Sequence, residues 1–506
     1  MNCANYFVDR HLHEGRSDKV AFREVHGDNR ELTFGQLAAD SDQSGASFKN
    51  AGVSEHQRAA MFVLDQIEFP VIFWGAIKAG VEPVALNTLL STDVYRNIIA
   101  DCDASIAFIS FELLDVVLPA CEAVEKIVVV GGDAPAGTIS YNEFMSAELP
   151  PLTIKDCDDS DVAFWLYSSG STGKPKGVRH KHSSMQYTCD TYARQLLDIR
   201  EDDLVFSAAK LFFAYGLGNG MSFPMSVGAT SLLYNARPTP DSVTDILREY
   251  KPTIYYGVPT LYAALIHKWE ADGAPDVPLR LCVSAGEALP AEIGKKWQAL
   301  TGTDIIDGVG STEMLHIFLS NAPNDVVYGT SGVAVPGYEV RLVDENGDDV
   351  ADGELGEMIV RGNSSALDYW NQSEKTAATF DGEWTHTGDK YELAENGRYI
   401  YCGRTDDMFK VSGIWVSPFE VEQALIEYPA ILEGAVVAHK DEDNLEKPKA
   451  FVVLKEGHGP ESLDDLADFV KQRIGKWKYP RWVEVVDELP KTATGKIQRF
   501  KLRAPV

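Results

Sequence analysis

The stretch YSSGSTGKPKGV, Tyr167 to Val178, follows the apolar run DVAFWLY and is the best guide to the fold of this chain. Glycines, hydroxyls and lysines gathered behind an apolar strand favour a loop that grips a phosphate chain over a solvated Gly/Ser linker. The loop is not a Walker A loop, G-x-x-x-x-G-K-[ST], because two residues separate Gly170 from Gly173 and Pro175 forbids a helix start at Lys174. The expected phosphate donors are Ser168, Ser169, Gly170, Ser171, Thr172, Gly173, Lys174 and Lys176.

Length and composition limit the class of protein. A chain of 506 residues exceeds one typical core and is expected to form at least two domains. The formal charge of −30 argues against nonspecific binding to nucleic acid or to an anionic membrane. We expect no secretory signal and no membrane span, because neither a basic-then-apolar start nor an apolar run of about 18 residues is present. The seven scattered cysteines and the histidines lack metal-ligand spacing, which predicts reduced thiols in a cytoplasmic protein without structural metal.

The hydrophobic pattern changes along the chain. Strand-length apolar runs alternate with helical patterns through the first four hundred residues, which predicts α/β layers with largely parallel sheets. From about Tyr338 the pattern predicts antiparallel strands, with a turn at Asn346-Gly347. A compact α+β unit follows, with a helix that begins at Ser417-Pro418 and a long helix over residues 462–474.

Further polar clusters stand where turns are expected, and each alone indicates no more than a turn. They are SAGEALP (284–290), DGVGSTEMLH (307–316), WTHTGD (384–389), GRTDDMFKVSG (403–413) and PKTATGKIQR (490–499). In this order, and together with residues 167–178, they resemble the adenylate-forming superfamily of acyl-CoA synthetases, peptide-synthetase adenylation domains and firefly luciferase. The resemblance covers almost the whole chain. The segments KLFFAYGLGNG (210–220), YYGVPTLYA (255–263) and GSTEMLHIFLSN (310–321) are most similar to benzoate-CoA ligases and related aryl-CoA ligases.

The resemblance implies a fold and a domain division. Residues 1–404 would form a large N-terminal domain of layered α/β sheets with a β-barrel-like subdomain, which binds ATP and the carboxylate. Residues 405–506 would form a small mobile α+β domain that swivels about Asp406 between two half-reactions. The alternative is that Asp406 is a static residue of a turn.

The resemblance also assigns nucleotide-binding roles. Thr312 would contact the α-phosphate, and Glu313 would hold Mg²⁺, a hard cation that suits carboxylate and phosphate oxygens. Asp389 would accept hydrogen bonds from the ribose hydroxyls, with Arg404 beside it. Gly286 and Glu287 would line the adenine edge, and Asp307 and Gly308 would complete the ATP site. Val309 stands where many relatives have an aromatic residue that stacks on adenine, so aliphatic contact would replace the stack.

Lys496 is the expected catalytic lysine, acting with Thr312 and Glu313. In PKTATGKIQR it matches the family lysine that reaches the acyl carboxylate and the α-phosphate; the alternative is a solvated surface lysine. Rotation of the C-terminal domain would withdraw Lys496 and bring Lys410, Ser412 and Gly413 to the pantetheine of CoA.

Aromatic and small residues are expected to form the pocket for the acid. An aromatic ring needs a flat slot, which Phe213, Ala214, Tyr215 and Gly216 would provide ahead of an apolar helix: Tyr215 offers an edge or a hydroxyl, and Gly216 permits close approach. His316 would face the same pocket, or be a satisfied structural residue.

These residues predict an ATP-dependent aryl-CoA ligase. It would convert benzoate or a substituted benzoate into an acyl adenylate with release of pyrophosphate, and then transfer the acyl group to CoA. Two alternatives stay open: an adenylation enzyme that loads a carrier protein in trans, and an adenylate-binding regulator without catalysis. The expected ligands are an aromatic carboxylate, ATP, Mg²⁺ and CoA, with no prosthetic group, and a homodimer is an open alternative for the oligomeric state.

Overall fold

The computed structural model describes residues 1–158, 160–169, 175–411, 414–442, 445–491 and 497–503. The predicted loop residues 170–174, together with Ser412, Gly413 and Lys496, lie outside the described residues. Residue contacts divide the chain into two units, Met1–Glu339 with Val360–Thr385 and Val340–Ile359 with His386–Val506. The predicted domain boundary after residue 404 marks where residues 405–506 would swivel, and this boundary stays a prediction.

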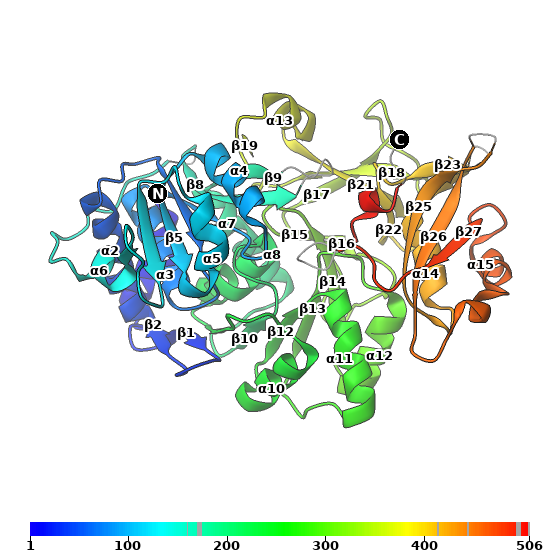
Figure 1. Ribbon diagram of the computed structural model, residues 1–506, viewed down its shortest axis with the longest axis horizontal. Helices are drawn as coiled ribbons and strands as arrows, with labels where there is room; N and C mark the ends of the chain where they lie inside the picture. The colour runs from blue at the N-terminus through cyan, green and yellow to red at the C-terminus, as the bar shows by residue number, and fades with distance from the viewer. Residues whose placement is uncertain (159, 170–174, 412–413, 443–444, 492–496, 504–506) are drawn as a thin grey trace. The chain divides into compact units, whose positions relative to one another are not determined.

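Two large sheets, each mostly parallel, form the first unit (Figure 1). The nine-stranded sheet has the order β16 (Val333–Ala334), β15 (Ile317–Ser320), β14 (Ile305–Gly310), β13 (Leu281–Ser284), β12 (Ile254–Gly257), β10 (Leu204–Ser207), β11 (Thr230–Leu233), β1 (Val20–Glu24) and β2 (Glu31–Thr33). The eight-stranded sheet has the order β19 (Asp368–Tyr369), β9 (Pro175–Lys181), β8 (Val162–Ser169), β4 (Glu82–Ala85), β3 (Arg58–Phe62), β5 (Ala104–Ser110), β6 (Lys126–Val130) and β7 (Ile139–Ser140). Antiparallel pairs occur at the edges, between β1 and β2, β14 and β15, β15 and β16, β8 and β9, and β9 and β19. The expectation of largely parallel sheets is therefore confirmed.

Helices pack against both sheets and close the cores of the first unit. They are α1 (Arg10–His13), α2 (Phe34–Asn50), α3 (Glu68–Ala79), α4 (Thr92–Cys102), α5 (Leu114–Val117), α6 (Tyr141–Ser146), α7 (His182–Thr188), α8 (Ala214–Leu217), α9 (Phe223–Val227), α10 (Pro240–Tyr250), α11 (Pro259–Asp272), α12 (Ala291–Thr301) and α13 (Ser373–Thr379), with π-helical segments at Asn5–Asp9, Cys189–Leu196 and Gly218–Ser222. Apart from Glu68, every residue of α3 is buried, as expected for a helix that is apolar on all sides. Helices α10, α11 and α12 lie beside β12 to β14 and share a core with them that contains Trp269 and Trp297 (Figure 1).

The second unit contains antiparallel strands and the α+β part of the chain. A five-stranded sheet contains β17 (Glu339–Val343), β18 (Gly356–Arg361), β21 (Trp384–Leu393), β20 (Phe380–Asp381) and β22 (Tyr399–Arg404). The unit boundary passes through β17, β18 and β21, which leaves β20 in the first unit and β22 in the second. The remaining elements are β23 (Phe409–Val411), β24 (Ile414–Val416), α14 (Pro418–Ile426), β25 (Ile431–Lys440), β26 (Glu446–Leu454), α15 (Leu466–Ile474) and β27 (Trp482–Val485). The predicted turn is present: Gly347 has φ +84°, and Val343 pairs with Asp349.

The two predicted helices of the α+β part have different outcomes. Helix α14 begins as expected, with Pro418 at its first position and Ser417 Oγ accepting from Glu420 N at 3.1 Å. The expected helix over 462–474 is shorter, because Pro460–Leu463 is a separate 3₁₀ turn and α15 begins at Leu466. The Tyr428 hydroxyl binds Ser462 O and the Asp465 carboxylate at this entrance, so Asp465 does not cap the helix.

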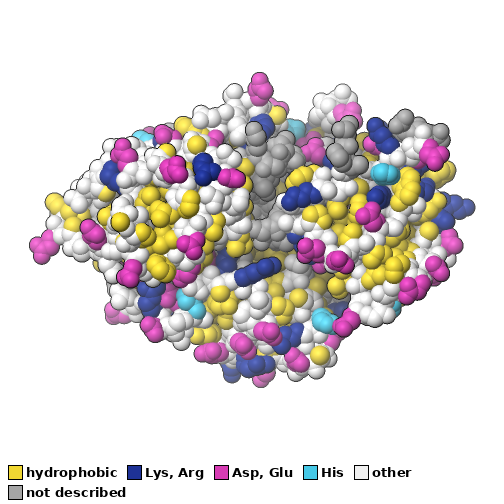
Figure 2. All heavy atoms as spheres, in the orientation of Figure 1, with side chains coloured by type: hydrophobic (Ala, Val, Ile, Leu, Met, Phe, Trp, Pro, Cys, Tyr) yellow, Lys and Arg dark blue, Asp and Glu magenta, His cyan; other side chains and the backbone are white. Residues whose placement is uncertain are grey.

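The surface reflects the acidic composition. On the face shown in Figure 2, acidic side chains are scattered among lysines and arginines and are not gathered into one patch. All seven cysteines are free thiols, and only Cys402 is not fully buried. Within the part of the chain that the structure describes, no helix has the length and apolar character that a membrane crossing requires.

Candidate active site

Strands β8 and β9, on either side of the predicted phosphate loop, pair as an antiparallel hairpin. Strand β8 ends at Ser169 and β9 begins at Pro175, with Ser168 opposite Lys176 and Tyr167 opposite Gly177. A strand, not a helix, therefore follows the predicted phosphate loop, as Pro175 requires. The register places Ser168 and Lys176 on adjacent strands at the base of that loop.

Ser168, Lys176, Glu313 and Tyr369 form one contact group, here called the Glu313 cluster. The Tyr369 hydroxyl donates to Glu313 Oε1 at 2.7 Å, and Ser168 Oγ donates to the same oxygen at 3.5 Å. Lys176 Nζ lies 4.1 Å from the centre of the Tyr369 ring. Strand β19 pairs with β9, Tyr369 opposite Val178, which brings the tyrosine to the hairpin. The cluster therefore joins the predicted metal ligand to the predicted phosphate loop.

Sequence reasoning did not identify Tyr369. The residue lies 56 positions from Glu313, and no local spacing connects the two. The antiparallel pairing of the short strand β19 with β9, and the hydrogen bond that Ala366 N donates to Glu313 O at 2.8 Å, bring them together.

The turn from Ser311 to His316 carries Glu313 and reverses the chain after β14. Ser311 Oγ accepts from Met314 N at 3.1 Å, and Leu315 takes the left-handed conformation, with φ +65°. A Cβ at position 310 would lie 2.5 Å from His316 O, so only glycine allows this close reversal. Thr312 and Glu313 are half-buried, whereas His316 is buried.

His316 packs among Tyr192, Tyr215 and Phe223, a group here called the His316 cluster. The His316 ring lies 5.6 Å from Tyr192 and Tyr215 and 4.4 Å from Phe223, between ring centroids. Its Nε2 is 3.1 Å from Asn219 Oδ1, and its Nδ1 has no hydrogen-bond partner among the described residues. Burial lowers the pKa of His316 to about 3, so the ring is neutral at physiological pH.

One expectation for the acid pocket needs correction, and the contacts of Tyr215 and Gly216 narrow two others. The helix begins at Ala214 itself, with Phe213 at its N-cap, so most of the predicted segment lies inside the helix and not ahead of it. The Tyr215 hydroxyl lies 3.2 Å from Gly257 O and 3.1 Å from Val283 O; it donates to these strand-end carbonyls, which leaves the ring for contact. A Cβ at Gly216 would lie 2.0 Å from Lys210 O, so the close approach there is to the chain's own backbone. The assignment of these residues to the acid stays a prediction.

The residues predicted for the adenine edge follow β13, and the two that would complete the ATP site lie in the neighbouring parallel strand β14. Strands β13 and β14 pair with Ser284, the last residue of β13, opposite Asp307, so Gly286 and Glu287 follow the end of β13 beside the part of β14 that contains Asp307 and Gly308. Asp307 is 5% exposed, its Oδ1 has no hydrogen-bond partner among the described residues, and burial raises its pKa well above the usual range. Ligands of open α/β sheets bind at such carboxyl ends of strands.

Asp389 and Arg404 face each other in the second unit. They are directly opposite on β21 and β22, and Arg404 Nη1 donates to Asp389 Oδ1 at 2.9 Å and to Thr387 O at 2.8 Å. Burial disfavours the Arg404 charge, but Asp389 more than offsets this effect and raises the pKa of Arg404. The predicted pairing of these two side chains is therefore present, and their contact with a ribose stays a prediction.

The predicted hinge and CoA residues are partly described. Asp406 is exposed, in a turn where Met408 N donates to Arg404 O at 3.1 Å, and its own carbonyl accepts from Arg503 at 3.3 Å. Lys410 is exposed, with Nζ 4.5 Å from the Trp415 ring centre.

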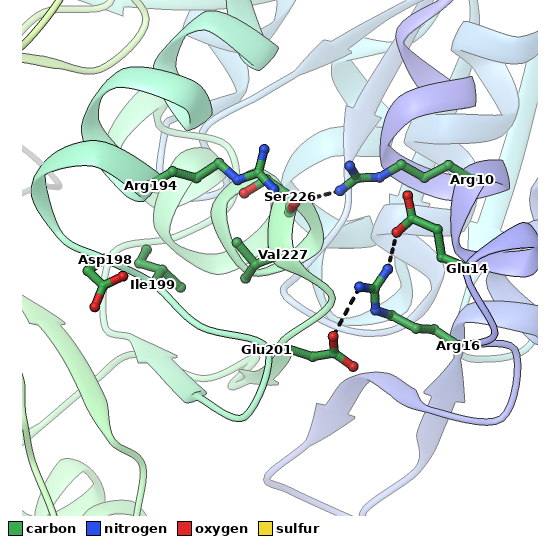
Figure 3. Close-up of a pocket in the computed structure, with 9 residues that line it drawn as sticks. All are labelled: Arg10, Glu14, Arg16, Arg194, Asp198, Ile199, Glu201, Ser226 and Val227. Carbon is green, nitrogen blue, oxygen red and sulfur yellow. Dashed lines mark hydrogen bonds and ion pairs between the residues drawn. The ribbon is translucent and has the colours of Figure 1, made fainter.

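A separate polar pocket of about 330 Å³ lies in the first unit (Figure 3). Arg16 pairs there with Glu14 and Glu201, and Arg10 donates to Ser226 O. The opposed charges satisfy one another, and none of the predicted site residues lines this pocket.

The donor chemistry of the Glu313 cluster fits a magnesium ion. Mg²⁺ is commonly held by one or two carboxylates together with substrate phosphates and water. Glu313 supplies one such carboxylate beside Lys176 and the hairpin. The described residues contain no group of three metal-ligating side chains, so most ligands of the ion would come from the nucleotide and water.

Comparison with known proteins agrees with this arrangement. Residues 9–370 match the family model described as AMP-binding enzyme, and residues 420–496 match its C-terminal domain. The chain is 51% identical over 510 residues to the benzoate–CoA ligase of Thauera aromatica, with 99% of this chain and 96% of the relative covered. It is 50% identical over 513 residues to the 4-hydroxybenzoate–CoA/benzoate–CoA ligase of Rhodopseudomonas palustris, with 99% and 94% covered.

A solved structure extends the likeness to the fold. A benzoate CoA ligase from Burkholderia xenovorans superposes with a TM-score of 0.92 at 45% identity, covering 100% of both chains. The predicted fold class and the predicted superfamily are confirmed by these matches.

Proposed function

Because the chain belongs to the family of AMP-binding enzymes, we propose that it is an ATP-dependent aryl-CoA ligase. Its acid is benzoate or a benzoate substituted with a small group, in keeping with the printed activities of its relatives. The carboxylate attacks the α-phosphorus of ATP and displaces pyrophosphate, and the thiol of CoA then attacks the acyl carbon and displaces AMP. Both steps conserve atoms and electrons.

One observation carries this proposal. The turn from Ser311 to His316 places Glu313 in a polar cluster beside the phosphate hairpin and His316 in an aromatic cluster. An enzyme that joins an anionic phosphate to a flat apolar acid needs these two environments side by side.

Each group has a defined task in the first step. Lys176 and the hairpin bind the phosphates and Thr312 contacts the α-phosphate. Glu313 would hold Mg²⁺, which would supply positive charge to neutralise the phosphates. Asp389, oriented by Arg404, binds the ribose hydroxyls. Lys496 brings positive charge to the reacting oxygens, and the Tyr215 ring contacts the acid.

A panel of carboxylic acids with ATP, Mg²⁺ and CoA tests the proposal. Benzoate is expected to exceed acetate and palmitate in kcat/KM, and pyrophosphate and thioester are expected in equal amounts. Equal rates with palmitate and benzoate would contradict it. Pyrophosphate without consumption of free CoA would indicate loading of a carrier protein, and absence of pyrophosphate would indicate a non-catalytic adenylate-binding protein.

The two half-reactions separate the roles proposed for the C-terminal residues. Lys496→Ala is expected to slow adenylation by about 10²–10³ while leaving thioester formation from preformed benzoyl-AMP near the wild-type rate. Asp406→Pro is expected to show the opposite pattern, because a stiffened hinge blocks the rotation. Equal loss of both halves in Lys496→Ala would leave a single fixed active site as the better account.

The remaining assignments follow from the same interpretation. Buried free thiols agree with a reducing compartment, and we propose the cytoplasm. A homodimer stays a prediction, which light scattering at micromolar concentration would test.

A further inference from the structure

Lys210, whose side chain is 14% exposed, and the buried Asp65 form an ion pair that connects the two large sheets of the first unit. Asp65 follows β3 of the eight-stranded sheet, and Lys210 follows β10 of the nine-stranded sheet. Asp65 is 5% exposed, and Lys210 Nζ lies 3.9 Å from Asp65 Oδ2. Neither residue belongs to the predicted ATP or acid site, although Lys210 begins the aryl-CoA-ligase-like segment KLFFAYGLGNG.

Lys210 and Asp65 also form hydrogen bonds with backbone atoms. Lys210 Nζ donates to Tyr234 O and to Ala236 O, the latter at 2.7 Å, and both acceptors follow β11. Asp65 Oδ1 accepts from Leu211 N at 3.2 Å. The loop between β10 and α8 is therefore anchored to one sheet through the Lys210 side chain and to the other through the Leu211 amide.

Backbone contacts connect this anchor to Ala214 and Tyr215. Lys210 O accepts from Phe213 N at 3.0 Å, and the same carbonyl is the atom that leaves no room for a Cβ at Gly216. A shift of the Lys210 backbone would therefore displace the first turn of α8. Because packed interiors transmit small displacements, the Tyr215 ring and the Ala214 methyl would move with it.

A purely stabilising role does not account for this arrangement. Burial of an ion pair costs desolvation that its attraction often fails to offset, so an apolar pair of similar volume would serve stability as well. Lys78 provides the comparison within the same unit: it is fully buried and 2.7 Å from both Asp9 and Asp42. These two ion pairs are shorter than that of Lys210, and their lysine lies in α3, not in the loop that leads to α8.

We propose that Lys210 and Asp65 are positioning residues that set the depth of Ala214 and Tyr215 and thereby the discrimination of aromatic from non-aromatic acids. This inference rests on the proposed function, since it concerns the acid side of the same site.

Three variants of the full-length protein test the inference. Lys210→Met removes the charge and keeps the stem, Asp65→Asn keeps an acceptor for the Leu211 amide, and the double variant measures their coupling. The KM for benzoate is expected to rise about tenfold or more in Lys210→Met and by a smaller factor in Asp65→Asn, which keeps the hydrogen bond to Leu211, with the KM for ATP within twofold of wild type in both. The ratio of kcat/KM for benzoate to that for acetate is expected to fall by a similar factor, and the double variant is expected to be less impaired than the product of the single effects.

Lys78→Met is the matched control. It removes a buried lysine that pairs with two carboxylates and is expected to lower the melting temperature while leaving the benzoate-to-acetate ratio unchanged. If Lys210→Met does not fold, Asp65→Asn alone carries the measurement, because it preserves the volume and the hydrogen bond.

The inference is overturned if the benzoate-to-acetate ratio of kcat/KM in Asp65→Asn and Lys210→Met equals that of the wild type. It is also overturned if Lys78→Met changes this ratio as much as Lys210→Met does. Failure of the proposed function has a different signature: the wild-type protein would not activate benzoate at all. In that case the preferred acid of the panel replaces benzoate in the same ratio, and the positioning role is judged on that acid.

Discussion

The Glu313 cluster and the His316 cluster stand on the same turn but satisfy their polar groups in opposite ways. Glu313 is half-buried and accepts from Tyr369 and Ser168, which belong to other strands. His316 is enclosed by aromatic rings, with one ring nitrogen that has no partner among the described residues. A turn that is polar at one residue and apolar three residues later can present charge and a flat hydrophobic surface to a single ligand.

The removal of charge from the polar cluster is the strongest test of this contrast. Glu313→Gln keeps an oxygen for Tyr369 and Ser168 but loses the negative charge, and adenylation is expected to slow by about 10²–10³. Pyrophosphate release at saturating benzoate measures the effect, and the KM for benzoate is expected to change little. Glu82→Gln is the matched control, since Glu82 is a buried carboxylate that accepts from Trp165 Nε1. Comparable loss of adenylation in both variants would contradict a specific role of Glu313.

Filling the aromatic side is expected to have the next largest effect. Ala214→Leu adds three carbons beside the first turn of α8, and kcat/KM for benzoate is expected to fall by about 10–200-fold with ATP binding unchanged. Kinetics with benzoate and its hydroxylated and amino derivatives would measure the altered preference. An unchanged acid profile would place the acid elsewhere.

The pH dependence of stability provides a third test of the His316 environment. Burial lowers the His316 pKa to about 3, whereas an unfolded histidine titrates near 6.5. Below pH 6.5 the unfolded chain therefore binds a proton that the folded chain rejects, and this residue removes about 2 kcal/mol of stability between pH 7 and pH 5. Urea unfolding measures the free energy of unfolding at pH 7 and at pH 5. The decrease in this free energy from pH 7 to pH 5 is expected to be about 2 kcal/mol smaller in His316→Gln than in the wild type. The same pH difference in the variant and the wild type would mean that His316 accepts a proton in the fold.

The smallest expected effect concerns the hydroxyl of Tyr369. Tyr369→Phe removes the 2.7 Å donor to Glu313 and keeps the ring beneath Lys176. We expect a rise of about fivefold in the KM for ATP-Mg²⁺, corresponding to about 1 kcal/mol, with benzoate kinetics unchanged. Initial rates measured over a range of magnesium concentrations give this KM. A change in the KM for benzoate alone would mean that Tyr369 does not act through Glu313.

Much of the local structure could be predicted because its causes are local. Pro175 excluded a helix after the loop, Ser417-Pro418 began α14, and Asn346-Gly347 formed the expected turn. Alternating apolar runs predicted the parallel sheets, because buried strands carry continuous apolar sequence.

The sequence by itself determined the family, the order of the motifs and the residue types that its chemistry needs. The tertiary structure decided which of these residues meet, since contacts such as Tyr369 with Glu313 and Asp65 with Leu211 depend on strand pairing across long separations. It also decided which atoms are already engaged: the Tyr215 hydroxyl binds strand-end carbonyls, and Gly216 makes room for Lys210. The physical reason is that residue type and spacing specify local conformation and chemical capability, whereas burial and hydrogen-bond partners arise only when distant segments pack together.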